Sequence, residues 1–101
     1  MRLQIILIAI LSVLLTTGSA VAGETYRCIF GQQERIISVV YPKPDQTLPC
    51  EVHYEKDGQS EILWQAENEA GYCEEKARDF VEEQRAWGWI CLESREESNP
   101  Q

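Results

Sequence analysis

Residues 50–66, CEVHYEKDGQSEILWQA, contain the pattern that decides the fold. Apolar and polar side chains alternate over residues 50–55, which is typical of a strand with one buried face. Asp57 and Gly58 follow, and this dipeptide favours the positive φ angles of a two-residue hairpin turn. The apolar face then continues on the returning strand, at Ile62, Trp64 and Ala66. The stretch therefore predicts an antiparallel hairpin.

Two more strands are expected before this hairpin. Residues 25–30 alternate, with Tyr26, Cys28 and Phe30 on one face. Residues 35–41 are rich in β-branched side chains, which favour a strand. Three prolines bracket the connection that follows, and since proline removes ladder donors we expect an irregular loop there. The prolines are Pro42, Pro44 and Pro49.

The period changes to that of a helix at Tyr72. The residues that recur at helical spacing are Cys73, Ala77, Phe80, Val81 and Gln84. We expect one amphipathic helix that runs to about Ala86 and ends at Gly88. Residues 93–101 lack apolar side chains and are expected to form a flexible acidic tail. The predicted fold is α+β: a four-stranded antiparallel meander with one helix packed on it.

The start of the chain has the pattern of a secretory signal peptide. A basic Arg2 precedes an apolar run over residues 3–15, and Ala20-Val21-Ala22 supplies the small residues of a cleavage site. The run is shorter than the ~20 residues of a membrane anchor. We therefore expect a signal peptide at residues 1–22, one domain at 23–92, a periplasmic or secreted location, and no membrane attachment after cleavage.

Four cysteines follow the leader, Cys28, Cys50, Cys73 and Cys91, and no two of them form a Cys-x-x-Cys pair. In an exported chain this favours two structural disulfides. In a meander, Cys50 lies at the end of the sheet where the helix begins, beside Cys73. The helix returns Cys91 to the opposite end, near Cys28. The predicted bridges are Cys50–Cys73 and Cys28–Cys91.

The chain carries 17 acidic and 9 basic residues, a net charge of −8 that becomes −9 when Arg2 is removed with the leader. Such a surface repels phosphate backbones and anionic membranes. It leaves a cationic protein as a possible partner, and it also keeps a small protein soluble and monomeric. We expect a monomer that binds no nucleic acid.

No arrangement of residues indicates catalysis. His53 is the single histidine, on the polar face of its strand and without a nucleophile beside it. The acidic pairs lack the spacing of a calcium loop or of a glycosidase cleft. These pairs are Glu67 with Glu69, and Glu74 with Glu75. We predict a protein that is not an enzyme and that binds no metal and no cofactor.

Trp87-Gly88-Trp89 is the most unusual local feature. Two indoles beside a glycine can present an aromatic platform to a glycan or a partner protein. The alternative is that one indole covers the Cys28–Cys91 bridge and completes a small core. Trp87 and Trp89 are the candidate interaction residues.

Four short motifs, taken in order, resemble those of small exported bacterial proteins without an assigned activity. They are Tyr26-Arg27-Cys28, Pro49-Cys50-Glu51-Val52, Tyr72-Cys73-Glu74 and Trp87-Gly88-Trp89-Ile90-Cys91. The first third, with Tyr26, Cys28, Gly31 and Tyr41, is also similar to the start of bacterial inhibitors of c-type lysozyme. The inhibitory loops of that family have no counterpart here, so no inhibitory residue carries over.

The leading hypothesis for function is a non-catalytic binding or interaction module. One alternative is inhibition, through the acidic helix, of a cationic envelope hydrolase such as lysozyme, because opposite charges raise the encounter rate. The other is a structural protein of the envelope.

Overall fold

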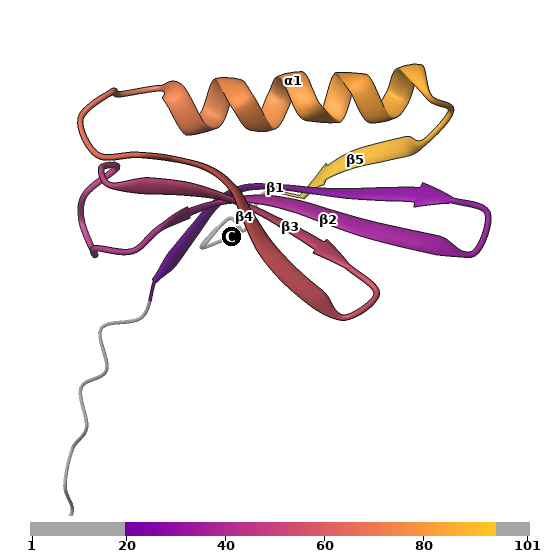
Figure 1. Cartoon of the computed structure of the whole chain (residues 1–101), viewed down its shortest axis with the longest axis horizontal. Coiled ribbons are helices and arrows are strands. Elements are labelled where there is room, and N and C mark those ends of the chain that lie inside the picture. Colours follow the sequence, from indigo (N-terminus) through magenta and orange to yellow (C-terminus); the bar gives the residue numbers. More distant parts are fainter. Residues whose placement is uncertain (1–19, 95–101) are drawn as a thin grey trace, which may run out of the picture.

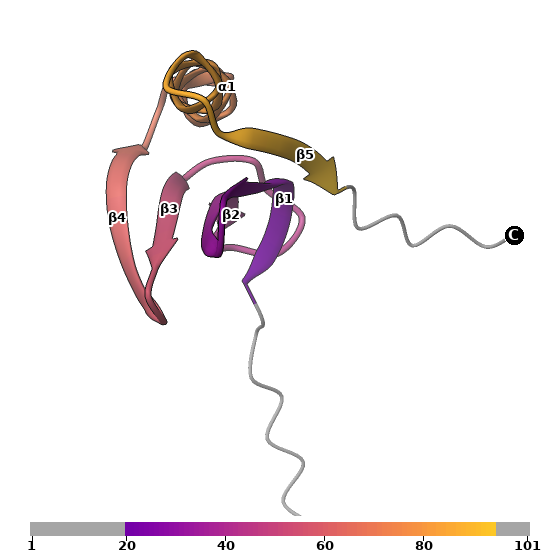
Figure 2. The same cartoon turned by 90° about the vertical axis from the view of Figure 1, so that its right-hand side faces the viewer.

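The computed structural model describes residues 20–94, which form five strands and one helix (Figure 1). In chain order the elements are β1 (Val21–Phe30), β2 (Gln33–Tyr41), β3 (Cys50–Lys56), β4 (Gln59–Ala66), α1 (Tyr72–Ala86) and β5 (Ile90–Ser94). The strands build one antiparallel sheet in the order β4-β3-β2-β1-β5. Figure 2 shows the sheet curving beneath α1, which touches every strand. The predicted α+β class and the helix boundaries are confirmed.

The sheet has a fifth strand, which the predicted four-stranded meander lacks. β5 pairs with β1 over the whole of its length, with Cys91 opposite Cys28. Its sequence has only five residues, of which the last two are polar, so local periodicity gives little sign of a strand. The strand forms because α1 returns the chain to the free edge of β1. It includes Glu93 and Ser94, which the sequence had assigned to the tail.

The described residues extend past both expected boundaries, that of the signal peptide after Ala22 and that of the tail before Glu93. β1 begins at Val21, two residues before the expected cleavage point, and Val21 and Ala22 pair with Tyr41 and Val40. The remainder of the expected leader, residues 1–19, and of the expected tail, residues 95–101, lies outside the described residues.

The predicted hairpin is confirmed, with a correction to its second strand. Asp57 and Gly58 have φ of 53° and 77°, the positive angles that this turn requires. A bulge interrupts the pairing of β3 with β4, because Trp64 lies opposite Val52 whereas Ile62 lies opposite His53. One extra residue exchanges the two faces of the strand. Ile62 therefore leaves the core face, where the sequence placed it, and is 51% exposed.

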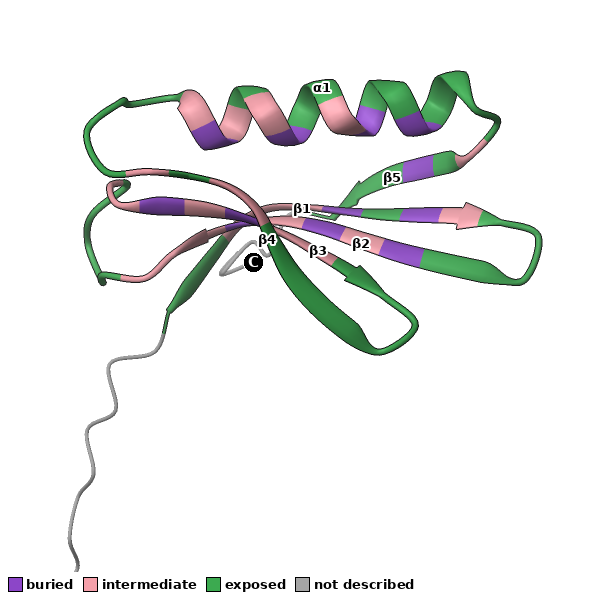
Figure 3. Ribbon diagram, viewed as in Figure 1, coloured by how far each residue is buried: buried purple, intermediate pink, exposed green. Residues whose placement is uncertain are grey.

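The core lies between α1 and one face of the sheet (Figure 3). Ile37, Val39 and Val52 of the sheet are fully buried, and Val81 of α1 is nearly so. Beside them Phe80 packs edge-on against two aromatic rings, 5.1 Å from Tyr54 and 5.7 Å from Trp64 between ring centroids.

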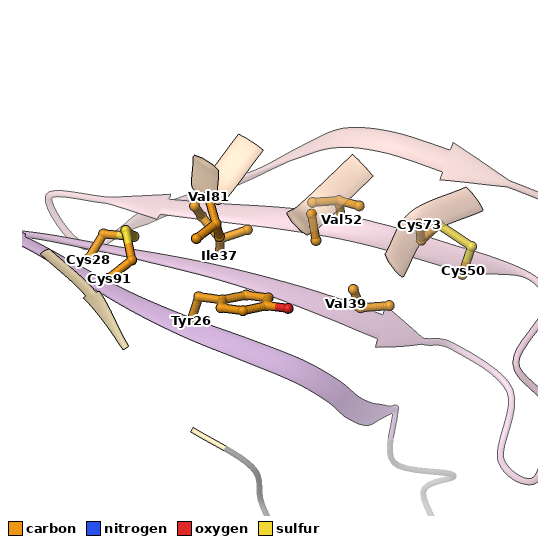
Figure 4. Packing of buried hydrophobic residues seen from close by; sticks show 10 residues of the cluster. Tyr26, Cys28, Ile37, Val39, Cys50, Val52, Cys73, Val81 and Cys91 are labelled. Carbon is orange, nitrogen blue, oxygen red and sulfur yellow. A yellow bond between two sulfur atoms is a disulfide. The ribbon is translucent and has the colours of Figure 1, made fainter. Parts of the chain in front are cut away.

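Both predicted disulfides are present, and they close the core at its two ends (Figure 4). Cys50 joins the start of β3 to Cys73 in the first turn of α1, with 6.1 Å between their Cα atoms. Cys28 joins β1 to Cys91 of β5, and these two residues face each other directly across the strands. Two disulfides are typical of a protein that folds outside the reducing cytosol.

Candidate interaction surface

The end of α1 determines where the two candidate tryptophans lie. Gly88 has a φ of 99°, and its N–H donates to the carbonyl of Arg85 while the N–H of Trp89 donates to that of Gln84. These two hydrogen bonds to the last turn, together with a glycine in the left-handed region, end the helix sharply. The turn directs Trp87 and Trp89 into different environments.

Trp89 turns toward the core. Its ring lies 5.4 Å from that of Phe30, between centroids, and the guanidinium of Arg35 lies over its indole at 5.2 Å. The indole packs against the buried cluster and is only partly exposed. For Trp89 the alternative of a structural role, which the sequence left open, is the one the geometry supports.

Arg35 is a buried charge that sequence reasoning missed, since it appeared only as the first residue of a strand. It is 7% exposed. Its guanidinium donates to the carbonyl of Glu34 and to the side chain of Gln33, and it lies 3.7 Å from the carboxylate of Asp57. A planar guanidinium can stack on an indole and donate hydrogen bonds in its own plane. Arg35 thereby packs on one face of the Trp89 indole and holds the ring in position.

Trp87 is 64% exposed and belongs to a larger apolar region. The described residues include six large hydrophobic side chains that are exposed, and four of these belong to the end of α1, to β5 and to the end of β1, segments that lie at one end of the molecule (Figure 1). We call these four the β5 corner: Phe30, Trp87, Ile90 and Leu92. The other two, Val21 and Ile62, lie elsewhere on the sheet.

The β5 corner has side chains on both faces of the sheet, because Phe30 shares the face of Cys28 whereas Ile90 and Leu92 lie on the face that α1 leaves uncovered. Cys91 points into the core, so its neighbours Ile90 and Leu92 point to the opposite face. Ile90 lies directly opposite Ile29, and Leu92 opposite Arg27. The aliphatic side chains of β5 and β1 thus form one continuous surface.

Charges at the β5 corner are paired. Arg27 forms an ion pair with Glu34. Arg85 forms an ion pair with Glu82 and also donates to the carbonyl of Cys91, at 2.9 Å. The two arginines nearest the β5 corner are therefore both paired with carboxylates.

The residues weighed as catalytic or metal-binding groups do not converge. His53 lies on the uncovered face of β3, where its Nε2 is 2.7 Å from Glu51. Glu67 and Glu69 lie before α1, exposed to solvent. Within residues 20–94 no group of three metal-binding side chains occurs. No helix in that range has the length and apolar character needed to cross a membrane.

A tyrosine–carboxylate network lies at the other end of the sheet. The Tyr41 hydroxyl donates to Glu74 Oε1 at 2.6 Å, and the Tyr26 hydroxyl donates to Glu24, which also pairs with Arg78. Burial, with the hydrogen bond to its carboxylate as the second cause, raises the pKa of each tyrosine well above the ordinary 10.0.

One oxygen of this network has no partner. Glu74 Oε2 is buried and accepts no hydrogen bond within the described residues. The network joins β1 and β2 to the first two turns of α1. It contains no nucleophile, and we assign it a structural role.

Two open hollows lie on the sheet near β4. One, of about 320 Å³, follows the β3–β4 hairpin and is lined by Tyr54, Lys56, Asp57, Gln59, Ser60 and Glu61. The other, of about 460 Å³, lies along β4 and is lined by Ile62, Leu63, Trp64 and Gln65.

Comparison with known proteins finds no matching family model, no similar curated protein and no similar solved structure.

Proposed function

We propose that this chain is a small, exported, non-catalytic interaction module that contacts its partner through the β5 corner. The observation that carries the proposal is that four of the six exposed large hydrophobic side chains belong to segments that meet at one end of the molecule. Contiguous apolar patches on small soluble proteins mark interaction sites, whereas scattered exposed residues need no explanation. Trp87 is the expected anchor, because exposed tryptophan dominates binding energy at many interfaces.

The chemistry of the corner favours a protein partner over a glycan. A sugar stacks on aromatic rings and needs polar groups around them. The corner instead contains two exposed aliphatic residues, Ile90 at 67% and Leu92 at 65% exposure. The neighbouring cations already have partners in Glu34 and Glu82. An apolar protein surface of matching shape suits this composition.

The test uses envelope extract from the organism that makes the protein. The mature chain is immobilised, bound proteins are identified, and the dissociation constant of each purified partner is measured for wild type, Trp87→Ala/Leu92→Ala and Ile62→Ala. The double variant should bind at least about tenfold more weakly. The Ile62 variant, which loses an exposed aliphatic side chain on the opposite edge strand, should keep wild-type affinity for a partner that contacts the β5 corner. A partner that binds the double variant as tightly as wild type overturns the assignment of the corner.

Export is part of the same proposal. The leader pattern supports delivery to the periplasm or beyond, with removal of residues 1–22. Intact mass of protein recovered from its host tests this, since the expected chain begins at Gly23. A mass that includes the apolar run overturns it.

A second candidate function is inhibition of a cationic envelope hydrolase. The supporting observation is the acidic excess, 15 acidic against 7 basic residues over 20–94. Opposite charge speeds association without providing specificity. Titration of purified lysozymes at low salt tests it, and undiminished activity with micromolar excess of the mature protein removes this candidate.

A further inference from the structure

The two edges of the sheet differ in their accessibility. β5 lies beside the end of α1, and Arg85 donates to its Cys91 carbonyl. β4 is the other terminal strand, and among residues 20–94 only β3 pairs with it (Figure 2). In an antiparallel strand every second residue directs its N–H and C=O away from the paired neighbour. Over the eight residues Gln59–Ala66, those groups face a side where no strand lies.

The side chains along this free edge form a groove. The hollow of about 460 Å³ is lined by consecutive residues of β4, from Ile62 to Gln65. The bulge directs Ile62 to the uncovered face of the sheet, while Trp64 packs beneath Lys76 and Phe80 on the helix side. A strand added here would find apolar side chains on both faces. This is the arrangement by which sheet edges recognise extended peptides.

Carboxylates outnumber cations beside the edge, where Lys56 lies opposite Gln59 and Lys76 lies 5.9 Å from the centroid of the Trp64 ring. From Asp57 to Glu75 the chain contains six carboxylates and no lysine, arginine or histidine. Asp57 lies near Arg35, and Glu74 accepts from Tyr41. Glu61 within β4, and Glu67 and Glu69 just after it, are exposed and form no ion pair among the described residues. An extended segment beside β4 therefore meets a net negative charge, which these three carboxylates supply.

We propose that the β4 edge binds an extended, lysine- or arginine-rich segment of a cationic protein, which adds to the sheet beside β4. Charge complementarity selects this occupant. A second copy of this chain would bring its own carboxylates to the same edge, and like charges across strands are destabilising. The site is separate from the β5 corner, so the proposal does not depend on the proposed function.

The experiment uses a peptide as long as β4, of alternating lysine and valine, titrated into the mature protein at low ionic strength. Amide resonances of residues 59–66 and the indole N–H of Trp64 should shift, and those amides that face the free edge should exchange more slowly. The matched control peptide carries N-methyl groups on every second residue, which removes its ladder donors but keeps its charge.

The expected result is that the N-methylated peptide binds at least about tenfold more weakly. Glu61→Gln/Glu67→Gln/Glu69→Gln should weaken binding about tenfold as well, because three opposite-charge contacts are lost. Trp87→Ala/Leu92→Ala should bind the peptide normally. Equal binding of the N-methylated peptide, shifts centred outside β4, or no shift at about 1 mM peptide overturns the proposal.

Discussion

At the scale of single residues, Trp87 and Trp89 show how one glycine separates two identical side chains. Gly88 lets the chain reverse, so Trp89 packs on Phe30 and Arg35 while Trp87 points to solvent. The sequence indicated both indoles as candidates and could not rank them, since their environments depend on β1 and β2, which are distant in the chain. The structure assigns packing to one and leaves the other available for contact.

The different environments of Trp87 and Trp89 predict that their replacement changes the free energy of unfolding by different amounts. Trp89→Ala should lower the free energy of unfolding by about 2 kcal/mol, because a partly buried ring and its contact with Arg35 are lost. Trp87→Ala should change it by less than about 0.5 kcal/mol. Urea denaturation followed by circular dichroism measures both. Equal losses in the two variants would show that Trp87 also packs.

The raised pKa values of the two tyrosines predict that the folded state becomes less stable at alkaline pH. Because the pKa values of Tyr26 and Tyr41 are raised in the folded state, the unfolded chain loses these protons first as the pH rises above about 10. The stabilisation of the folded state that these raised pKa values represent is fully present below that pH. Above it, stability should fall by about 1.4 kcal/mol per pH unit for each tyrosine until the folded pKa is reached.

Denaturant titrations from about pH 9 to about pH 11 measure this slope. Tyr26→Phe and Tyr41→Phe each remove one ionisable group, so each variant should show a shallower decline than wild type. The absence of any difference would contradict the assigned pKa directions.

At the scale of elements, the features that could be predicted from the sequence are those that residues adjacent in the chain determine. The Asp57–Gly58 turn, the helix Tyr72–Ala86 and its end at Gly88 each follow from adjacent residues. The bulge in the β3–β4 pairing leaves the apolar-polar alternation of the sequence unmarked, and β5 depends on pairing with the distant β1, so the exposure of Ile62 and the aliphatic part of the corner could not be predicted. The disulfides could be predicted because the order of elements alone fixes which ends meet.

The end of α1 gives an element-scale prediction. Gly88→Ala and Gly58→Ala both place a Cβ at a positive φ, and each should cost about 1 kcal/mol or more. A Cβ at Gly88 also approaches the Phe30 ring at 3.3 Å, whereas Gly58 faces open space. Only the Gly88 variant should therefore displace Phe30, seen as changed ring resonances of Phe30 and Trp89. Unchanged resonances there would mean that the turn relaxes by another route.

At the scale of the whole molecule, the two disulfides hold α1 and β5 on the sheet from opposite ends of the core. The Cys28–Cys91 bridge spans 63 residues and Cys50–Cys73 spans 23. Loop-closure entropy then predicts losses of about 4.3 and about 3.4 kcal/mol when each pair is replaced by alanine. Denaturation of Cys28→Ala/Cys91→Ala and of Cys50→Ala/Cys73→Ala measures the order, and a reversed order would contradict the entropic account.

The same two variants separate stability from the position of the β5 corner. Without Cys28–Cys91, β5 loses its covalent link to β1 and is held by noncovalent contacts such as strand pairing and the Arg85 hydrogen bond, so its amides should lose protection from hydrogen exchange before those of β2 and β3 do. Without Cys50–Cys73 the loosened element is the start of α1, far from the corner. Partner binding should therefore fall in the first variant and persist in the second under conditions where both are folded. Equal binding by both would show that β5 is held by its strand pairing, and that the bridge stabilises the fold without positioning the surface.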